Sequence, residues 1–170
     1  MSKYETAPYK VLEKDGEIEI RLYEGFFTAG VSENKSMDSD GFNQIFSYIS
    51  GNNDKHEKIP MATPVINNMG EDSADTEFVI PHGYSAETLP KPADPQVKIN
   101  WIEGRLAASI TFSGSVNENK IEGYEEKLKE WLAKRGIKMM GNFKLARYNS
   151  PFSLPPLRRN EIIIDIEGYK

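Results

Sequence analysis

The chain has 170 residues, a formal net charge of −5 and a hydrophobic fraction of 38%, values that are ordinary for a single globular domain with a buried core. Its acidic balance argues against a nucleic-acid binder that relies on a broad basic face. Because the chain has no cysteine and only two histidines, disulfides, thiolate metal sites, cysteine nucleophiles and histidine-rich metal clusters are all excluded.

No run approaches the roughly 18 apolar residues that a membrane span needs. The first residues, Met1–Thr6, are polar and lack the apolar core of a secretory signal. We therefore expect a cytoplasmic protein with no membrane partner.

A hairpin opens the predicted fold. Lys14-Asp15-Gly16 separates two segments of alternating residues, and Asp-Gly in this position is typical of a tight β-turn. In the second segment Ile18, Ile20 and Leu22 alternate with charged residues, which predicts one buried face. We interpret Arg21, on the opposite face, as an ordinary surface charge.

The first helix is predicted over 38–49. Asp38 or Ser39 can cap its start, and Gly51 suits the left-handed position that follows a helix end. Four apolar residues recur at i, i+3, i+4 and i+7 and predict one buried face: Phe42, Ile45, Phe46 and Ile49.

The segment Lys58–Ile66 follows this helix and contains Pro60 and Pro64. Proline fixes φ and has no backbone N–H, so the segment is not expected to be an ordinary central strand at these positions. We expect an extended strand that lines a cleft, with Lys58 at its mouth.

The second half of the chain begins after an irregular loop. Residues 81–96 contain four prolines, which makes regular structure there unfavourable. Strands over 97–102 and 106–112, a long helix over 117–135 ended by Gly136, and two further strands are then expected.

The order of elements repeats. Strand, helix, strand and strand are predicted at 27–32, 38–49, 61–67 and 76–80, and again at 106–112, 117–135, 143–148 and 161–166. Such a unit places its helix on one face of an antiparallel sheet, and two units can curl their sheets into a distorted barrel. We predict an α+β fold of duplicated strand-helix-strand-strand units in one domain, 1–170, with halves at 9–80 and 97–167.

Several short motifs follow one another along the chain in a specific order: Tyr9–Gly16, Ile18–Arg21, Tyr48–Asn53, Lys58–Val65, Leu89–Pro92, Phe112–Gly114, Ala146–Asn149 and Arg158–Glu161. In these motifs the chain resembles the SOUL haem-binding protein family over nearly its whole length. The resemblance implies a distorted eight-stranded antiparallel β-barrel with two α-helices, which binds haem or another tetrapyrrole in a shallow cleft and has no established catalysis.

The resemblance also places the cleft beside the first helix. It therefore points to the helix residues Phe42, Ile45, Phe46 and Ile49, and to Met61, as ligand contacts. Some family members carry a histidine, a proposed axial ligand, at the position of Leu22, and leucine cannot ligate iron. Met61-Ala62-Thr63-Pro64 stands where the family more often has Met-Thr-Ala-Pro. Haem is thus the expected cofactor, and no metal ligand is assigned.

Haem is a flat apolar plate with two carboxylates, so its site needs an apolar floor and cations at the rim. Met61 can supply an adaptable thioether or be an ordinary core residue. Lys58 can pair with a propionate or stay solvated. The planar guanidinium groups of Arg158 and Arg159 suit carboxylates, but one of them can instead pair with Glu161.

The two histidines have plain interpretations. His56 lies in a polar run next to Lys58 and is either an iron ligand or a solvated loop residue, of which we favour the second. His82, in Pro81-His82-Gly83, is interpreted as part of a turn.

No nucleophile motif, phosphate loop or dinucleotide fingerprint occurs, so we expect no enzymatic activity. Two functions are considered: a cytosolic haem or tetrapyrrole carrier or buffer, and an effector-binding module of the gyrase-inhibitor-like type for amphiphilic small molecules. Relatives of the second class include hydrolases, and such modules tend to place a glutamate in the cleft to meet cations. A protein-interaction domain with a vestigial cleft is a third interpretation. The sequence leaves the oligomeric state open.

Overall fold

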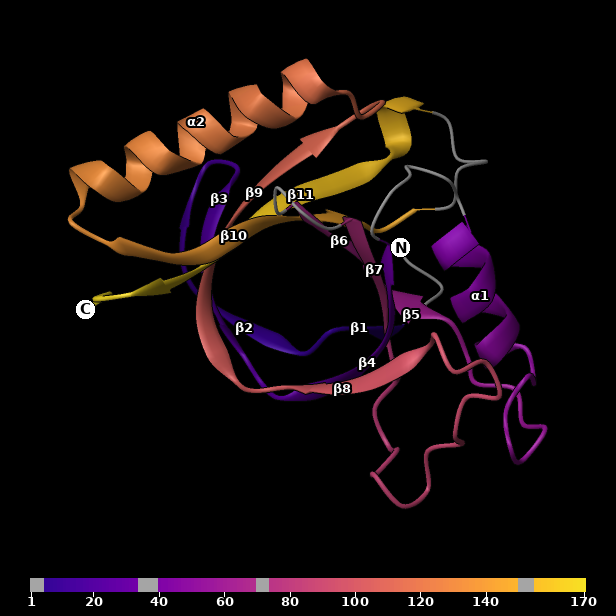
Figure 1. The fold of residues 1–170 in the computed structure, drawn as a ribbon. Helices are drawn as coiled ribbons and strands as arrows, with labels where there is room; N and C mark the ends of the chain where they lie inside the picture. Colours follow the sequence, from indigo (N-terminus) through magenta and orange to yellow (C-terminus); the bar gives the residue numbers. More distant parts are fainter. Residues whose placement is uncertain (1–4, 34–39, 70–73, 150–154) are drawn as a thin grey trace.

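A computed structural model describes residues 5–33, 40–69, 74–149 and 155–170. Nine strands form one antiparallel sheet in the order β2-β3-β9-β11-β10-β6-β7-β4-β8, and β1 and β5 form a short parallel pair. The sheet curls into a ring, with α2 across one side and α1 outside another (Figure 1). The elements are β1 (Glu5–Thr6), β2 (Tyr9–Asp15), β3 (Ile18–Tyr23), β4 (Phe26–Glu33), α1 (Asp40–Ile49), β5 (Ala62–Thr63), β6 (Val65–Met69), β7 (Ala74–Val79), β8 (Lys98–Ile102), β9 (Arg105–Ser113), α2 (Glu118–Lys134), β10 (Lys138–Arg147), the 3₁₀ turn η1 (Pro155–Leu157) and β11 (Arg159–Glu167).

The strand order confirms the duplicated units. In the first half β4 pairs with β7 and β7 with β6, and in the second half β9 pairs with β11 and β11 with β10. The halves join where β6 meets β10, with Ile66 opposite Ala146. One more strand flanks each half, β8 beside β4 and β3 beside β9. These eight strands match the predicted number, but they belong to an open curled sheet, and β2 adds a ninth strand at its edge because it is the hairpin partner of β3.

The segment expected as a single strand over 61–67 is divided in two. β5 ends at Thr63 and β6 begins at Val65, with Pro64 between them. Proline cannot donate to a strand ladder, which accounts for the interruption. The predicted irregular loop over 81–96 is confirmed, since its residues lie outside the helices and strands.

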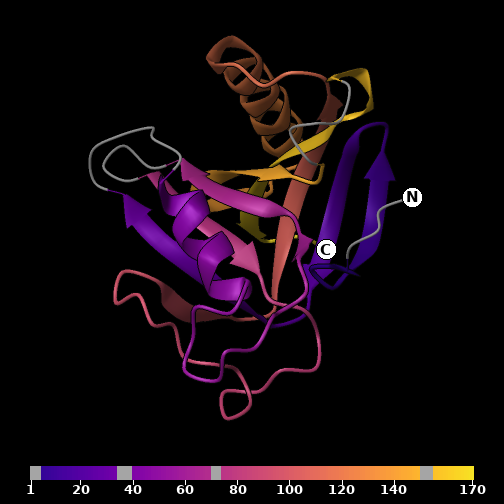
Figure 2. The ribbon, with the colours of Figure 1, turned by 90° about the vertical axis from the view of Figure 1, so that its right-hand side faces the viewer.

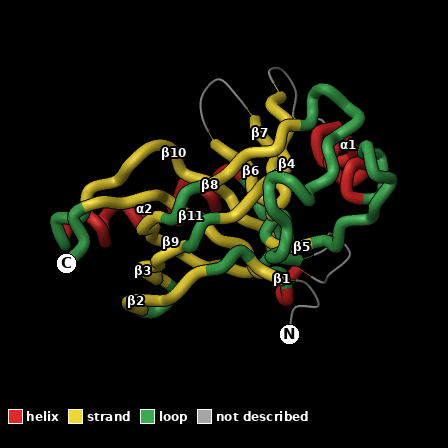
Figure 3. The backbone as a smooth tube through the Cα atoms, turned by 90° about the horizontal axis from the view of Figure 1, so that it is seen from below, coloured by secondary structure: helices red, strands yellow, loops and turns green. Residues whose placement is uncertain are grey.

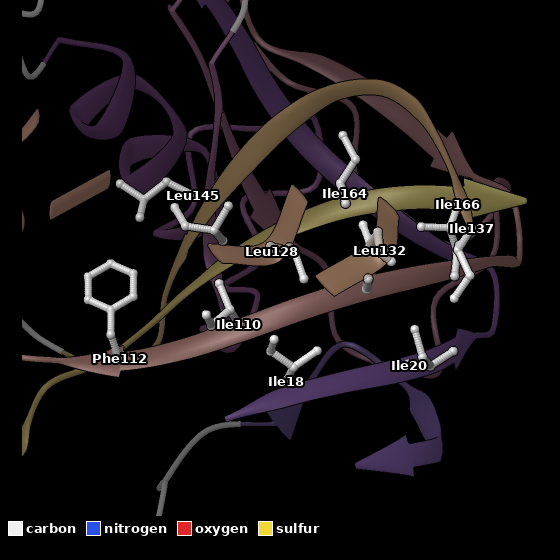
Figure 4. Close-up of a cluster of buried hydrophobic side chains, with 12 residues drawn as sticks. Ile18, Ile20, Ile110, Phe112, Leu128, Leu132, Ile137, Leu145, Ile164 and Ile166 are labelled. Carbon is white, nitrogen blue, oxygen red and sulfur yellow. The ribbon is translucent and has the colours of Figure 1, made fainter. Parts of the chain in front are cut away.

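Helix α2 covers the outer face of the second half. The side chain of Asn117 accepts a hydrogen bond from the Lys120 N–H at 2.9 Å and caps the helix start. Leu128 and Leu132 are buried against alternate residues of the strands below. Figure 4 shows this cluster of buried side chains, which includes Ile18, Ile20, Ile110, Leu145, Ile164 and Ile166.

Helix α1 covers the outer face of the first half. It spans Asp40–Ile49, within two residues of the predicted start; the predicted cap at Asp38 or Ser39 lies outside the described residues. Ile45 and Ile49 pack with Phe78 and other residues of the β4–β7–β6 sheet. Seen from below, α1 lies at one end of the molecule and the C-terminus at the other (Figure 3).

The inner face of the curled sheet is also buried. A third cluster there joins aromatic and small residues from both halves: Ala7, Tyr23, Phe26, Ala62, Ile66, Val79, Ala107, Ala146, Tyr148 and Ile163. The strands of the second half are therefore covered on both faces, by α2 outside and by the opposite wall of the curl inside. Polar residues of these strands that point inward, Arg21 and Glu161 among them, can thus be buried.

Candidate functional site

The outer surface of α1 presents an aromatic pair. The rings of Phe42 and Phe46 are stacked, with centroids 6.1 Å apart and planes 9° apart. Phe42 also packs on Phe78 of the sheet at 4.9 Å, whereas Phe46 is 50% exposed. The pair therefore offers an aromatic, apolar surface in which Phe42 is anchored to the core and Phe46 is open to solvent.

Ile45 and Ile49, the other two residues of the predicted helix stripe, lie beneath this surface. They are 0% and 6% exposed and belong to the core between α1 and the sheet. In this arrangement they support the aromatic pair, and their direct contact with a ligand stays a prediction.

Lys58 and Met61 lie beside α1. The N–H of Ile59 donates to the carbonyl oxygen of Ile49 at 2.8 Å, which brings the segment back to the end of the helix. Met61 is half-buried and packs against the same cluster as Phe42, while Lys58 is exposed. The structure thus places four of the predicted residues, Phe42, Phe46, Lys58 and Met61, around the first helix.

Arg159 lies on β11, away from the residues around α1. It is the first residue of β11 and its guanidinium donates to Glu161 Oε2 at 2.9 Å, stacks 4.0 Å from the ring centre of Tyr148, and donates to the Tyr9 hydroxyl at 3.2 Å. The predicted alternative, in which an arginine pairs with Glu161, is confirmed for Arg159. Its neighbour Arg158 is half-buried. Arg159 therefore joins a group on the inner face of the sheet, whereas α1 lies on the outer face.

The centre of this inner group is a buried ion pair. Arg21 donates to both carboxylate oxygens of Glu161, from Nη1 at 2.8 Å and from Nη2 at 2.5 Å, and both side chains are 0% exposed. Arg21 also donates to the hydroxyl of Tyr23 at 2.9 Å and to the carboxylate of Glu19 at 2.9 Å. The interpretation of Arg21 as a surface charge was wrong, because the curl of the sheet buries the second face of β3.

Hydroxyl groups complete the shell around Glu161. The Tyr148 hydroxyl donates to Oε1 at 2.7 Å and the Thr111 hydroxyl to Oε2 at 3.0 Å. Burial raises the pKa of Glu161, but the hydrogen bonds and charge of Arg21, with the charge of Arg159, outweigh that effect and lower it to about 2. Burial raises the pKa of Tyr148 well above its ordinary value, so its hydroxyl stays protonated and can donate.

This pKa makes stability depend on pH. The folded pKa of Glu161, about 2, is below its ordinary value of 4.5, so the unfolded chain binds more protons between these values. The stabilisation is present above pH 4.5 and is lost as the pH falls towards 2, by roughly 3 kcal/mol. We expect the difference in free energy of unfolding between the native chain and Glu161→Gln to shrink steadily across this window in urea titrations. A difference that is the same at pH 6 and pH 2.5 would contradict the assignment.

The position of Leu22 differs from the prediction. Ile18 and Ile20 are buried under α2 as expected, but Leu22 is 45% exposed. It pairs with Leu106 of β9 and Lys10 of β2. Leu22, the position considered above for an axial ligand, therefore lies on β3, whereas α1 packs on β4 and β7.

The histidines behave as loop residues. His56 is exposed and has a left-handed φ of 50°, and His82 lies in a turn, as predicted, where its N–H donates to the carboxylate of Glu5. Within the described ranges, histidine and carboxylate side chains do not gather in a group of three or more that could hold a metal ion. In those same ranges no helix has the length and apolar character needed to cross a membrane.

Comparison with known proteins assigns the class. The chain matches the SOUL heme-binding protein family over residues 4–165 and belongs to that family. It is similar to Heme-binding protein 1 of Xenopus laevis, with 30% identity over 163 residues that cover 88% of this chain and 84% of the relative. It is 29% identical to Heme-binding protein 1 of Mus musculus over 175 residues, which cover 93% of this chain and 90% of that one.

The fold occurs more widely than the family. A solved structure described as a hydrolase from Listeria innocua aligns with a TM-score of 0.65 at 9% identity, covering 92% of this chain and 94% of that chain. At this identity the likeness concerns the fold alone.

Proposed function

We propose that this protein is a cytosolic carrier or buffer that binds haem or another tetrapyrrole at the surface of α1 and catalyses no reaction. The observation that carries the proposal is the stacked Phe42–Phe46 pair, with Phe46 half exposed, on a helix whose last residue is hydrogen-bonded to the segment that carries Lys58 and Met61, in a chain that belongs to a haem-binding family.

The residues fit the ring and the carboxylates of a tetrapyrrole. Aromatic faces and a thioether suit a flat apolar ring, and the exposed ammonium of Lys58 can meet a propionate at the rim. In the described segment between α1 and β5, Met61 and His56 carry the sulfur and imidazole donors, and His56 lies exposed in a turn. We therefore assign binding to the ring and its carboxylates, without dependence on an iron ligand.

Titration with haemin and with protoporphyrin IX, each followed at the Soret band, tests this proposal. We expect saturable binding of both at micromolar concentration, with similar affinities because iron is not required. Phe46→Glu, which places a charge on the exposed ring surface, should weaken binding of both by about tenfold or more.

The matched control is Leu157→Glu, since Leu157 is 71% exposed and lies on η1. It should leave both affinities unchanged. Absence of a saturable Soret shift in the unmodified chain would overturn the proposal.

Glu161 cannot be the carboxylate of the effector-binding alternative. A cation-binding cleft needs a carboxylate that is free to meet the ligand, but Glu161 is fully buried and is already paired with Arg21 and Arg159. Glu77 of β7, which is half-buried and hydrogen-bonded to Thr28 and Asn68, is the glutamate that this alternative would use. We expect lipophilic cations such as tetraphenylphosphonium to leave the melting temperature unchanged. Stabilisation by these cations and not by porphyrins would favour the alternative.

A further inference from the structure

The turn after α1 is built around the side chain of Asn53, which is 2% exposed. Its amide nitrogen donates to the carbonyl oxygens of Tyr48 at 3.0 Å and Glu57 at 2.8 Å. Its amide oxygen accepts from the N–H groups of Lys55 at 3.2 Å and Glu57 at 3.1 Å. Two donors and two acceptor positions are all that an asparagine amide has, so every one of them is used within this turn.

The backbone of this turn needs such support. His56 has φ of 50°, in the left-handed region that few residues other than glycine adopt, although histidine does so more often than most. Gly51, at φ 122°, meets a similar demand without a side chain. The hydrogen bonds of Asn53 to Lys55 and Glu57, on the two sides of His56, hold the turn in this conformation.

The turn fixes the backbone at Lys58. The carbonyl oxygen of Glu57, which precedes Lys58, accepts from Asn53. The N–H of Ile59, which follows Lys58, donates to Ile49 at the end of α1 at 2.8 Å, and the Ile59 side chain is 3% exposed in the core. The backbone that carries the Lys58 side chain is therefore held from both directions.

The same turn holds the loop that precedes β8. Asn53 forms a backbone bridge with Pro92, the N–H of Asp54 donates to the carbonyl oxygen of Lys91 at 2.9 Å, and the Tyr48 hydroxyl donates to that of Pro90 at 2.6 Å. Figure 2 shows the two segments running side by side below α1. These hydrogen bonds join the two segments at the end of α1.

We propose that Asn53 is a positioning residue of the tetrapyrrole site: its amide holds the peptide between Glu57 and Lys58 so that Lys58 and Met61 stay beside the Phe42–Phe46 surface. This inference rests on the proposed function. A surface that is already in place loses less conformational freedom when the ligand binds, which increases affinity. Asn53 acts through the turn and does not touch the ligand.

Three variants of the full chain test this role, with protoporphyrin IX as the probe. Asn53→Ala removes all four hydrogen bonds, Asn53→Ser keeps a short acceptor for the turn N–H groups, and Leu132→Ala is the control, since Leu132 lies in the core under α2. Both Asn53→Ala and Leu132→Ala should lower the urea midpoint. At a temperature well below unfolding, Asn53→Ala should bind protoporphyrin about tenfold more weakly, Asn53→Ser less severely, and Leu132→Ala with unchanged affinity.

The outcomes separate the two proposals. If the unmodified chain binds protoporphyrin and both Asn53 variants bind it with the same affinity, Asn53 is merely structural and this inference is overturned while the proposed function stands. If the unmodified chain fails to bind, the proposed function falls and this inference with it. If Asn53→Ala fails to fold, Asn53→Ser gives the same comparison with Leu132→Ala.

Discussion

Replacing Arg21 by methionine should lower the free energy of unfolding by about 3–5 kcal/mol, as expected when one partner of a buried ion pair is removed. Methionine fills a similar volume but leaves Glu161 with one remaining cation, Arg159, whose side chain is 42% exposed. The carboxylate would stay buried without its two strongest donors. Urea unfolding at pH 7, followed by tryptophan fluorescence and circular dichroism, measures the loss.

Two further variants make this result specific. Lys138→Met removes an exposed pair with Glu167, whose side chains are 72% and 52% exposed, and should cost less than about 1 kcal/mol. The double variant Arg21→Met/Glu161→Leu should be more stable than Arg21→Met, because it removes the stranded charge. A loss for Arg21→Met no larger than that for Lys138→Met would contradict the description of the pair.

The second large effect is expected in the core beneath α2. Leu132 is 1% exposed and packs in the cluster of Figure 4. Leu132→Ala should lower the free energy of unfolding by about 2–5 kcal/mol, from lost burial and from the cavity left behind. Leu157→Ala, at a leucine that is 71% exposed, is the matched control and should change stability by less than about 0.5 kcal/mol. Equal losses in the two variants would show that α2 does not close this core.

The duplicated architecture was predictable because its signals are local. Two helices with apolar periodicity, each followed by a pair of strands, identify two similar units before any contact is known. The segments 61–67 and 143–148 occupy matching places in the two predicted units. The structure joins the two halves by pairing these segments, with Val65 opposite Arg147.

The buried ion pair was not predicted because alternating apolar and charged residues in a strand indicate that only the apolar face is buried. On β3 the isoleucines mark the face under α2, and the charged residues between them are then read as solvated. Only the curl of the sheet, which brings Arg21 and Glu161 together 140 residues apart in the chain, shows that the other face is buried too. A signal was present in Glu161, a charge that directly precedes the apolar run Ile162–Ile164.

The helix stripe shows a similar limit. Periodicity identified the apolar residues of α1 but could not divide them between core and surface. The structure places Ile45 and Ile49 inside and leaves Phe46 half exposed. For Arg159 the sequence left a rim position and a pair with Glu161 open, and the structure shows the pair with Glu161.

The most direct test of the proposed site is a ¹H–¹⁵N correlation spectrum of the labelled chain during titration with protoporphyrin IX, which is diamagnetic. We expect saturable shifts confined to the amides around Phe42, Phe46, Lys58 and Met61, with the amide shifts of α2, Arg21 and Glu161 unchanged. Shifts that cluster instead on the inner face around Arg159, or saturable binding with no shift near α1, would contradict the proposed site.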